Sequence, residues 1–302
     1  MTVRRPRLAG LVAAVVVAPL LAACTAVSPS PTTSRTFQVN DGNRPFTLHV
    51  PDSYNASKPA PLVILLHAYS QTGAGEESYF KLTPQSDTYG FLYAYPNGLV
   101  DRAHHHYWNA TDACCDAYGS KVDDSNYLSA LIKLIESRYT VDTQRVYLVG
   151  HSNGAFMTFR MACDHADQVT AIATLNGAMW QDVSRCHPST AVSILDVRST
   201  ADQTILYNGG RRDNSPYPSA TTTNNDWLSF DHCAATATNA PPLDLVRDLP
   251  GAETSVAQYS GCANGSTVET WTINRGSHNP HFGPNWAPDV ISWLLSQTKA
   301  VA

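Results

Sequence analysis

Hydrophobic patterning predicts alternating strands and helices from residue 36 onward. Residues 62–66 form a continuous apolar run, typical of a strand covered on both faces, and further strands are predicted at 91–95, 145–149, 191–197 and 268–273. Residues 46–50 instead alternate in polarity, which is typical of an edge strand. Apolar residues at helical spacing mark 123–135, 153–163 and 286–297 as helices. This alternation predicts an α/β fold, a mostly parallel sheet with helices on both faces.

The first 24 residues have the pattern of an export signal. Three arginines precede an apolar run, 8–21, which is shorter than a comfortable membrane span. The run ends in Leu-Ala-Ala-Cys24, which resembles the lipobox of bacterial lipoproteins, so we expect a lipid on Cys24. The alternative is an ordinary secretory signal cut nearby. Residues 25–35, rich in Ser, Thr and Pro, are predicted to form a tether, and 36–302 the catalytic domain.

Composition narrows the classes of partner. The 302 residues are 43% hydrophobic and 15% charged, which supports a packed core and excludes a disordered chain. The formal net charge of −5 leaves no basic footprint, so nucleic acid is excluded as a partner. We expect an extracellular protein at the cell-envelope surface that touches the membrane only through its lipid.

Seven cysteines give a second indication of export. With Cys24 assigned to the lipid, six remain, an even number that suits disulfides in an oxidising compartment. We favour two bridges, Cys163–Cys186 and Cys233–Cys262. The adjacent Cys114 and Cys115 are left, and a bridge between neighbours is strained because their Cα atoms lie only ~3.8 Å apart. A metal site is the rival use, but neither a CxxC pair nor a suitable His spacing supports it.

The most specific motif is Gly-His-Ser-Asn-Gly at 150–154, which matches the nucleophile elbow G-x-S-x-G. It follows a predicted strand and opens a predicted helix, the context in which such a turn raises a serine hydroxyl above a sheet. The glycines suit a turn too tight for a Cβ. Ser152 is therefore the candidate nucleophile.

A serine needs a base, and in this fold the chain order is Ser, acid, then His. His278 lies between the last predicted strand and helix, and His281 is its near rival. The histidines 104–106 precede Ser152 and are interpreted as a loop cluster, with a metal role as the alternative. Asp202 follows a late strand and is the expected acid; Asp196, inside that strand, is the alternative.

An oxyanion needs two backbone N–H donors. One is expected from Asn153, directly after the nucleophile, and the other from the loop after an early strand. That loop is 66–72, and we expect the donor to be Tyr69. We interpret His67 as a structural residue that orients the loop.

Several short motifs together resemble the polyhydroxybutyrate depolymerase and feruloyl esterase family of secreted α/β-hydrolases, which includes lipoproteins of the LpqC type. They are His67 with Gln71-Thr72, Tyr95-Pro96-Asn97-Gly98, Trp108-Asn109, Cys114-Cys115, Asp123-Asp124, Arg145-Val146-Tyr147, Thr200-Ala201-Asp202 and Gly276-Ser277-His278. The resemblance implies Ser152, Asp202 and His278 as a triad, Tyr69 and Asn153 as oxyanion donors, and feruloyl, acetyl or short hydroxyalkanoate esters as substrates. The chain departs from the family at Ala68, at Arg198-Ser199 and Gln203, and at Asn279.

The sequence thus predicts a serine esterase that works through an acyl-enzyme, with no metal and no organic cofactor. An acyltransferase of the cell envelope is the second hypothesis, because a hydroxyl acceptor competes with water for the same intermediate. A surface lipoprotein that binds without catalysis is the third, and the departures from the family pattern motivate it.

Overall fold

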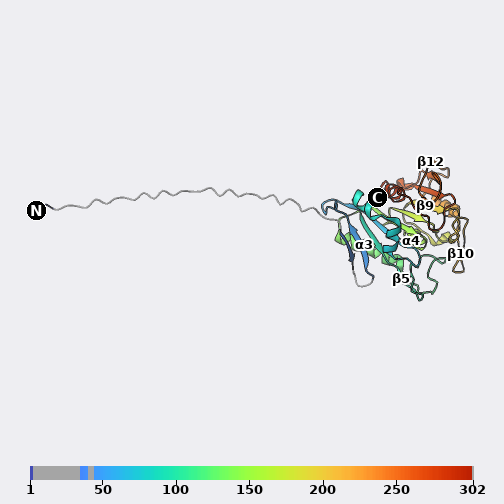
Figure 1. Cartoon of the computed structure of the whole chain (residues 1–302), viewed down its shortest axis with the longest axis horizontal. Coiled ribbons are helices and arrows are strands. Elements are labelled where there is room, and N and C mark those ends of the chain that lie inside the picture. The colour runs from blue at the N-terminus through green and yellow to red at the C-terminus, as the bar shows by residue number, and fades with distance from the viewer. Residues whose placement is uncertain (3–34, 40–43, 301–302) are drawn as a thin grey trace. The chain divides into compact units, whose positions relative to one another are not determined.

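The computed structural model describes residues 1–2, 35–39 and 44–300, and Thr32–Ala302 forms one unit of contacts (Figure 1). The predicted signal peptide beyond residue 2, the lipidation site Cys24 and the tether up to residue 34 lie outside the described residues. The first strand begins at Arg35, one residue before the predicted catalytic domain. None of the helices in the described ranges has the length and hydropathy of a membrane span.

Within the described residues, a ten-stranded sheet runs in the order β1-β2-β4-β3-β7-β8-β9-β14-β13-β12. The adjacent strands from β4 to β14 are parallel, and the two at each end are antiparallel. The strands are β1 (Arg35–Val39), β2 (Phe46–Val50), β3 (Ala60–Leu66), β4 (Leu92–Pro96), β7 (Val141–His151), β8 (Ala171–Leu175), β9 (Ser193–Ser199), β12 (Thr238–Leu243), β13 (Thr254–Tyr259) and β14 (Val268–Ile273).

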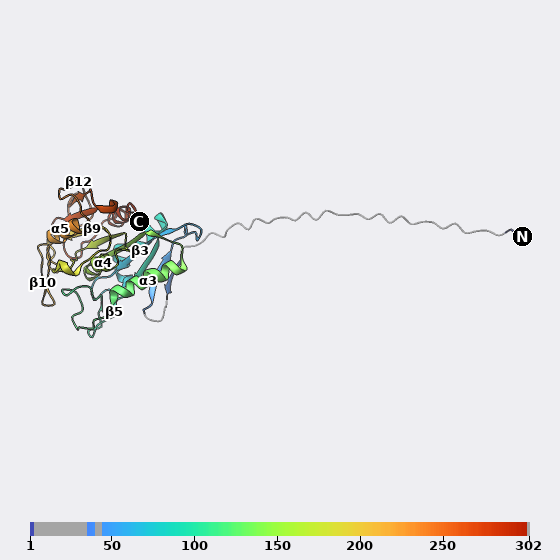
Figure 2. The ribbon, with the colours of Figure 1, turned by 180° about the vertical axis from the view of Figure 1, so that it is seen from behind.

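Helices cover both faces of this sheet, as Figure 2 shows from behind. They are α1 (Gly73–Phe80), α2 (Thr83–Tyr89), α3 (Asp124–Arg138), α4 (Asn153–Asp164), α5 (Ala220–Phe230) and α6 (Trp286–Leu295). One apolar core joins α3, α4 and α5 to the sheet, and a second joins α1 and α6 to the opposite face. Two short hairpins lie outside this sheet, β5 (Leu99–Val100) with β6 (His106–Tyr107), and β10 (Gly210–Arg212) with β11 (Ser215–Tyr217). Two 3-10 turns, Val183–Arg185 and Ala263–Gly265, complete the described elements.

The predicted α/β fold is confirmed, with one predicted strand in a different role. Residues 46–50 form β2, but they do not lie at the edge, because β1 pairs with one side of β2 and β4 with the other. All five side chains are consequently buried, polar Thr47 and His49 included. His49 satisfies both ring nitrogens, with Thr36 and Asp87. The alternation in polarity therefore reflects these polar partners rather than an exposed face.

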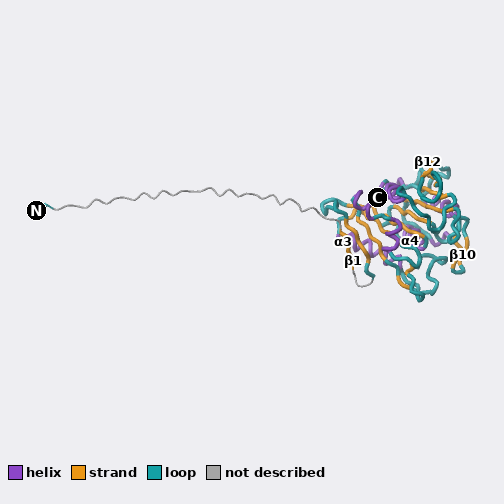
Figure 3. The backbone as a smooth tube through the Cα atoms, viewed as in Figure 1, coloured by secondary structure: helices purple, strands orange, loops and turns teal. Residues whose placement is uncertain are grey.

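Because the central strands are parallel, the loops that follow them lie at one edge of the sheet. Figure 3 distinguishes these strands, in orange, from the loops, in teal. Register pairs the end of β3, Leu66, with Gly150 of β7, and pairs His151 with Leu175 of β8. Farther along, Ile273 of β14 lies beside Ser199 of β9. Because ligands of open α/β sheets bind outside the carboxyl ends of the strands, this edge is the place to look for a site.

Candidate active site

The elbow between β7 and α4 has the geometry expected of the motif. The backbone of Ser152 has φ 52° and ψ −117°, a conformation that residues other than glycine rarely adopt, and α4 begins at the next residue. A Cβ on Gly150 would lie 2.4 Å from the carbonyl oxygen of Gly154, and one on Gly154 only 2.0 Å from that of Leu66. Both positions therefore require glycine, Gly150 because the turn folds back over it and Gly154 because it packs against the end of β3.

The three residues of the expected triad meet at the carboxyl edge. Nε2 of His278 lies 2.9 Å from Oγ of Ser152, and Nδ1 lies 2.7 Å from Oδ2 of Asp202. The other oxygen of Asp202 accepts hydrogen bonds from the backbone N–H groups of residues 204 and 205. A carboxylate held this way favours the tautomer with its proton on Nδ1, which leaves Nε2 free to accept the serine proton.

The rival candidates lie elsewhere. Asp196 is buried within β9 and accepts a hydrogen bond from Thr174 at 2.7 Å, and burial raises its pKa. His281 pairs at the surface with Asp248. In the histidine cluster, His106 Nδ1 donates to the carbonyl of Gly98, and His105 Nδ1 lies 3.1 Å from the phenol oxygen of Tyr69. Among the described residues, no group of three or more His, Cys, Asp and Glu side chains is arranged to hold a metal ion.

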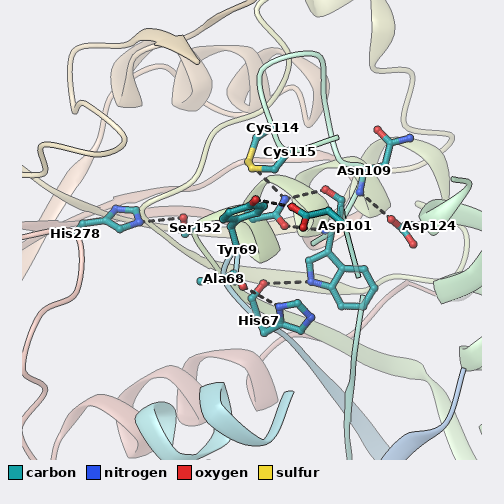
Figure 4. The surroundings of a disulfide bond; sticks show 12 residues. His67, Ala68, Tyr69, Asp101, Asn109, Cys114, Cys115, Asp124, Ser152 and His278 are labelled. Carbon is teal, nitrogen blue, oxygen red and sulfur yellow. Dashed lines mark hydrogen bonds between the residues drawn. A yellow bond between two sulfur atoms is a disulfide. The ribbon is translucent and has the colours of Figure 1, made fainter. Parts of the chain in front are cut away.

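The two expected oxyanion donors have no partner among the described residues. Among the hydrogen bonds of the described residues, none uses the backbone N–H of Tyr69 or of Asn153. The loop of Tyr69 is fixed on both sides, because Ser70, at φ 65°, donates its N–H to the carbonyl of His106 and Ala68 donates its N–H to the carboxylate of Glu76. The phenol of Tyr69 donates to Oδ2 of Asp101 at 2.6 Å, and in Figure 4 its ring lies between Ser152 and Asp101.

His67 has a structural position beneath this loop. Its Nε2 accepts the N–H of Gly98 at 2.9 Å, and its Nδ1 donates to the carbonyl of Ala68 at 2.8 Å. Burial lowers the pKa of His67 to about 4, so the ring is neutral at physiological pH. A neutral ring with one donor and one acceptor matches these two partners, so His67 joins the oxyanion loop to the turn after β4.

The six cysteines expected to pair form three disulfides. Both favoured bridges, Cys163–Cys186 and Cys233–Cys262, are present. The adjacent Cys114 and Cys115 are also joined, across a cis peptide bond. This third bridge lies beside the elbow, because the side-chain Nδ2 of Asn153 is 3.4 Å from Sγ of Cys114 (Figure 4).

Other residues of the site were not predicted from sequence. The side chain of Asn176, directly after β8, donates to the carbonyl of His278 at 3.0 Å and accepts the N–H of Ser199 at 2.8 Å. It therefore holds the histidine loop against the end of β9. Asn176 has a φ of 52°, a conformation in which asparagine is enriched. An asparagine directly after a strand was therefore the one sequence signal that could have pointed to this residue.

Comparison with known proteins gives this architecture a family. Residues 45–223 match the family model described as esterase PHB depolymerase. The chain belongs to this family. Feruloyl esterase B of Piromyces equi is 28% identical over 239 residues, which are 76% of this chain. Feruloyl esterase D of Neurospora crassa is 24% identical over 257 residues, 81% of this chain and 77% of that protein.

The family member described here spans only 41% of the length of the Piromyces esterase. Among solved structures, an acetyl xylan esterase from Aspergillus awamori superposes with a TM-score of 0.61 at 16% identity, over 86% of this chain and 98% of that chain. An S-formylglutathione hydrolase from Agrobacterium tumefaciens gives 0.56 at 13% identity, over 87% and 95%. Likeness at this level of identity establishes the α/β-hydrolase fold.

Proposed function

We propose that this protein is a serine carboxylic-ester hydrolase that works through an acyl-enzyme. The observation that carries the proposal is the continuous chain of hydrogen bonds from Ser152 Oγ through His278 to Asp202. Membership of the family also supports ester hydrolysis, because the family description and the names of the relatives are those of esterases.

In this mechanism His278 Nε2 removes the proton of Ser152 as Oγ attacks the ester carbonyl carbon. The oxyanion that forms accepts hydrogen bonds from the N–H groups of Tyr69 and Asn153. His278 then returns the proton to the leaving alcohol, and the acyl group stays on Ser152. Water, deprotonated by the same ring, attacks the acyl-enzyme and releases the acid.

The substrates we propose are feruloyl, acetyl or short hydroxyalkanoate esters. Relatives named feruloyl esterase and a fold relative named acetyl xylan esterase support the first two classes, and the name of the matching family supports the third. We also propose that the protein is exported and anchored by a lipid on Cys24. The three disulfides support export, because such bonds persist in oxidising compartments.

A fluorophosphonate probe tests the nucleophile directly. The purified chain from residue 25 onward should be labelled at Ser152, and Ser152→Ala should abolish both labelling and ester hydrolysis. Ser277→Ala is the matched control, since this exposed serine lies beside His278 and should leave labelling unchanged. A folded wild-type protein that refuses the probe would contradict the proposal and favour a binding role.

A panel of aryl and alkyl esters then defines the acyl group. Release of free acid supports hydrolysis. If an added alcohol is acylated in preference to water, the protein is an acyltransferase, and the hydrolase proposal is wrong.

A further inference from the structure

A single buried carboxylate connects two parts of the site. Oε1 of Glu76 lies 2.9 Å from Nδ1 of His151, and Oε2 accepts the backbone N–H of Ala68 at 2.9 Å. Glu76 is 1% exposed and His151 2%. Because Ala68 precedes Tyr69 and His151 precedes Ser152, this carboxylate links the oxyanion loop to the nucleophile elbow.

His151 extends this connection to the loop that carries His278. Its Nε2 lies 3.2 Å from the backbone carbonyl oxygen of His278, and the two imidazole rings are 5.3 Å apart between centroids. The elbow histidine therefore stands between α1 and the loop that carries His278. One chain of contacts runs from Ala68 through Glu76 and His151 to His278.

Both ring nitrogens of His151 face acceptors, a carboxylate on one side and a carbonyl on the other. A neutral imidazole carries one N–H and would leave one of these contacts without a proton, whereas an imidazolium satisfies both. Burial raises the pKa of Glu76, but attraction to His151 and the hydrogen bonds from His151 and Ala68 outweigh it and lower the pKa overall. Glu76 is thus an anion beside the ring.

The surroundings of His151 suit a cation. The rings of Tyr79 and Phe80 lie 5.5 and 6.0 Å from its ring between centroids, and both come from α1, the helix that carries Glu76. Both rings are tilted to the imidazole, by 49° and 33°, at a range where aromatic rings can attract a positive charge. The helix is itself fixed near its start, because Gly73 donates its N–H to Asn97 at 2.7 Å.

We propose that Glu76 and His151 form a buried ion pair that positions the nucleophile, the oxyanion loop and the histidine of the triad relative to one another. The inference rests on the proposed esterase function and adds two positioning residues to it. Neither side chain touches the substrate. The pair acts through the backbones of Ala68, Ser152 and His278.

The kinetic test replaces the carboxylate by its amide. In Glu76→Gln an NH₂ group must face one of the two N–H donors, so the oxyanion loop and elbow lose their common anchor. We expect kcat to fall about 100-fold, as for small misplacements of reacting groups. KM should change by less than about threefold, because binding groups remain in place.

Glu77→Gln is the matched control. Glu77, the next residue of α1, also accepts three hydrogen bonds, from the N–H groups of Leu82 and Thr83 and from the phenol of Tyr93, but none of these lies in the site. This variant should lose stability without losing kcat. If both variants lose kcat equally, or if Glu76→Gln keeps the wild-type kcat, the proposal is wrong.

The spectroscopic test needs no activity. Nitrogen-15 spectra of the Ser152→Ala protein, with Glu76 intact, should show both ring nitrogens of His151 protonated at neutral pH. A ring with a single proton would overturn the ion pair even if the enzyme is active. Conversely, a wild-type protein that hydrolyses no ester would refute the proposed function, while these spectra would still decide the state of His151.

Discussion

The side-chain amide of Asn153 holds both backbone polar groups of Trp108. Its Oδ1 accepts the N–H of Trp108 at 2.7 Å, and its Nδ2 donates to the carbonyl of the same residue at 2.9 Å. The indole of Trp108 in turn donates to the carbonyl of His67 at 3.1 Å. The residue after the nucleophile thus fixes the loop that bears the vicinal disulfide, and that loop fixes the start of the oxyanion loop.

Asn153→Ala should separate these two roles of Asn153, since it keeps the backbone N–H and removes the amide. It leaves the buried N–H of Trp108 without a partner, which costs about 1–3 kcal/mol, while the carbonyl of Trp108 keeps its hydrogen bond from the N–H of Cys115. We expect the free energy of unfolding, measured in urea, to fall by about 2 kcal/mol. Asn109→Ala is the control, because this half-buried amide makes one hydrogen bond in the same loop. Equal losses for the two variants would contradict the interpretation.

Two aspartates were candidates for the acid of the triad, and replacing each by asparagine should change kcat to a different extent. Asp202→Asn presents an amide NH₂ or oxygen to His278 and favours the wrong ring tautomer, so kcat should fall about ten-thousand-fold. Asp196→Asn should leave kcat nearly unchanged, because Asp196 contacts Thr174 rather than the triad histidine. Steady-state hydrolysis of one activated ester compares them. A large loss in Asp196→Asn alone would exchange the two assignments.

The site residues that could be predicted from the sequence each lie in or next to a pattern of neighbouring residues. Ser152 lies in a five-residue motif, and Asp202 and His278 follow strands in the order that the fold requires. The sheet was likewise predictable wherever a strand is a continuous apolar run. Strand β8, Ala171–Leu175, was missed although it is fully buried, because Thr174 interrupts its short apolar run.

The residues that the sequence did not locate act through tertiary contacts alone. Glu76 reaches His151 across 75 positions, and nothing near Glu76 distinguishes it from Glu77. The amide of Asn153 reaches Trp108 across 45 positions. Such pairings depend on which loops the parallel strands bring to the same edge, so they appear only once the topology is known.

Removing the bridge between Cys163 and Cys186 should destabilise the protein measurably. The bridge joins residues 23 positions apart, and Cys163 and Cys186 are both buried. Closing a loop of this size stabilises a protein by about 3 kcal/mol in the chain-entropy account. The double variant Cys163→Ala with Cys186→Ala should therefore lose about that much free energy of unfolding. A urea midpoint equal to the wild-type value would show that the bridge adds no stability.

Asp231 gives the protein a pH-dependent stability that one substitution should remove. The residue follows α5 and is buried, and burial raises the pKa of its carboxyl to about 7, against the lowering effect of hydrogen bonds from Ser266 and Val192. Among the described residues, Oδ2 of this carboxyl has no hydrogen-bond partner. Ionising the group in place therefore leaves a buried charge that is only partly compensated.

The sign of the effect follows from the proton balance. The ordinary pKa of the carboxyl is 3.8, so between pH 4 and 7 the unfolded chain releases a proton that the folded protein retains. The free energy of unfolding contributed by Asp231 therefore falls as the pH rises through this window, and levels off above pH 7. Asp231→Asn cannot titrate, and its amide oxygen can still accept the N–H of Val192. We expect the free energy of unfolding of the variant, relative to that of the wild type, to increase from pH 4 to pH 8 by on the order of 3 kcal/mol. Urea unfolding at each pH measures this difference. Other titrating groups cancel in this difference, so a difference that stays constant from pH 4 to 8 would show that the carboxyl of Asp231 is ionised in the folded protein throughout.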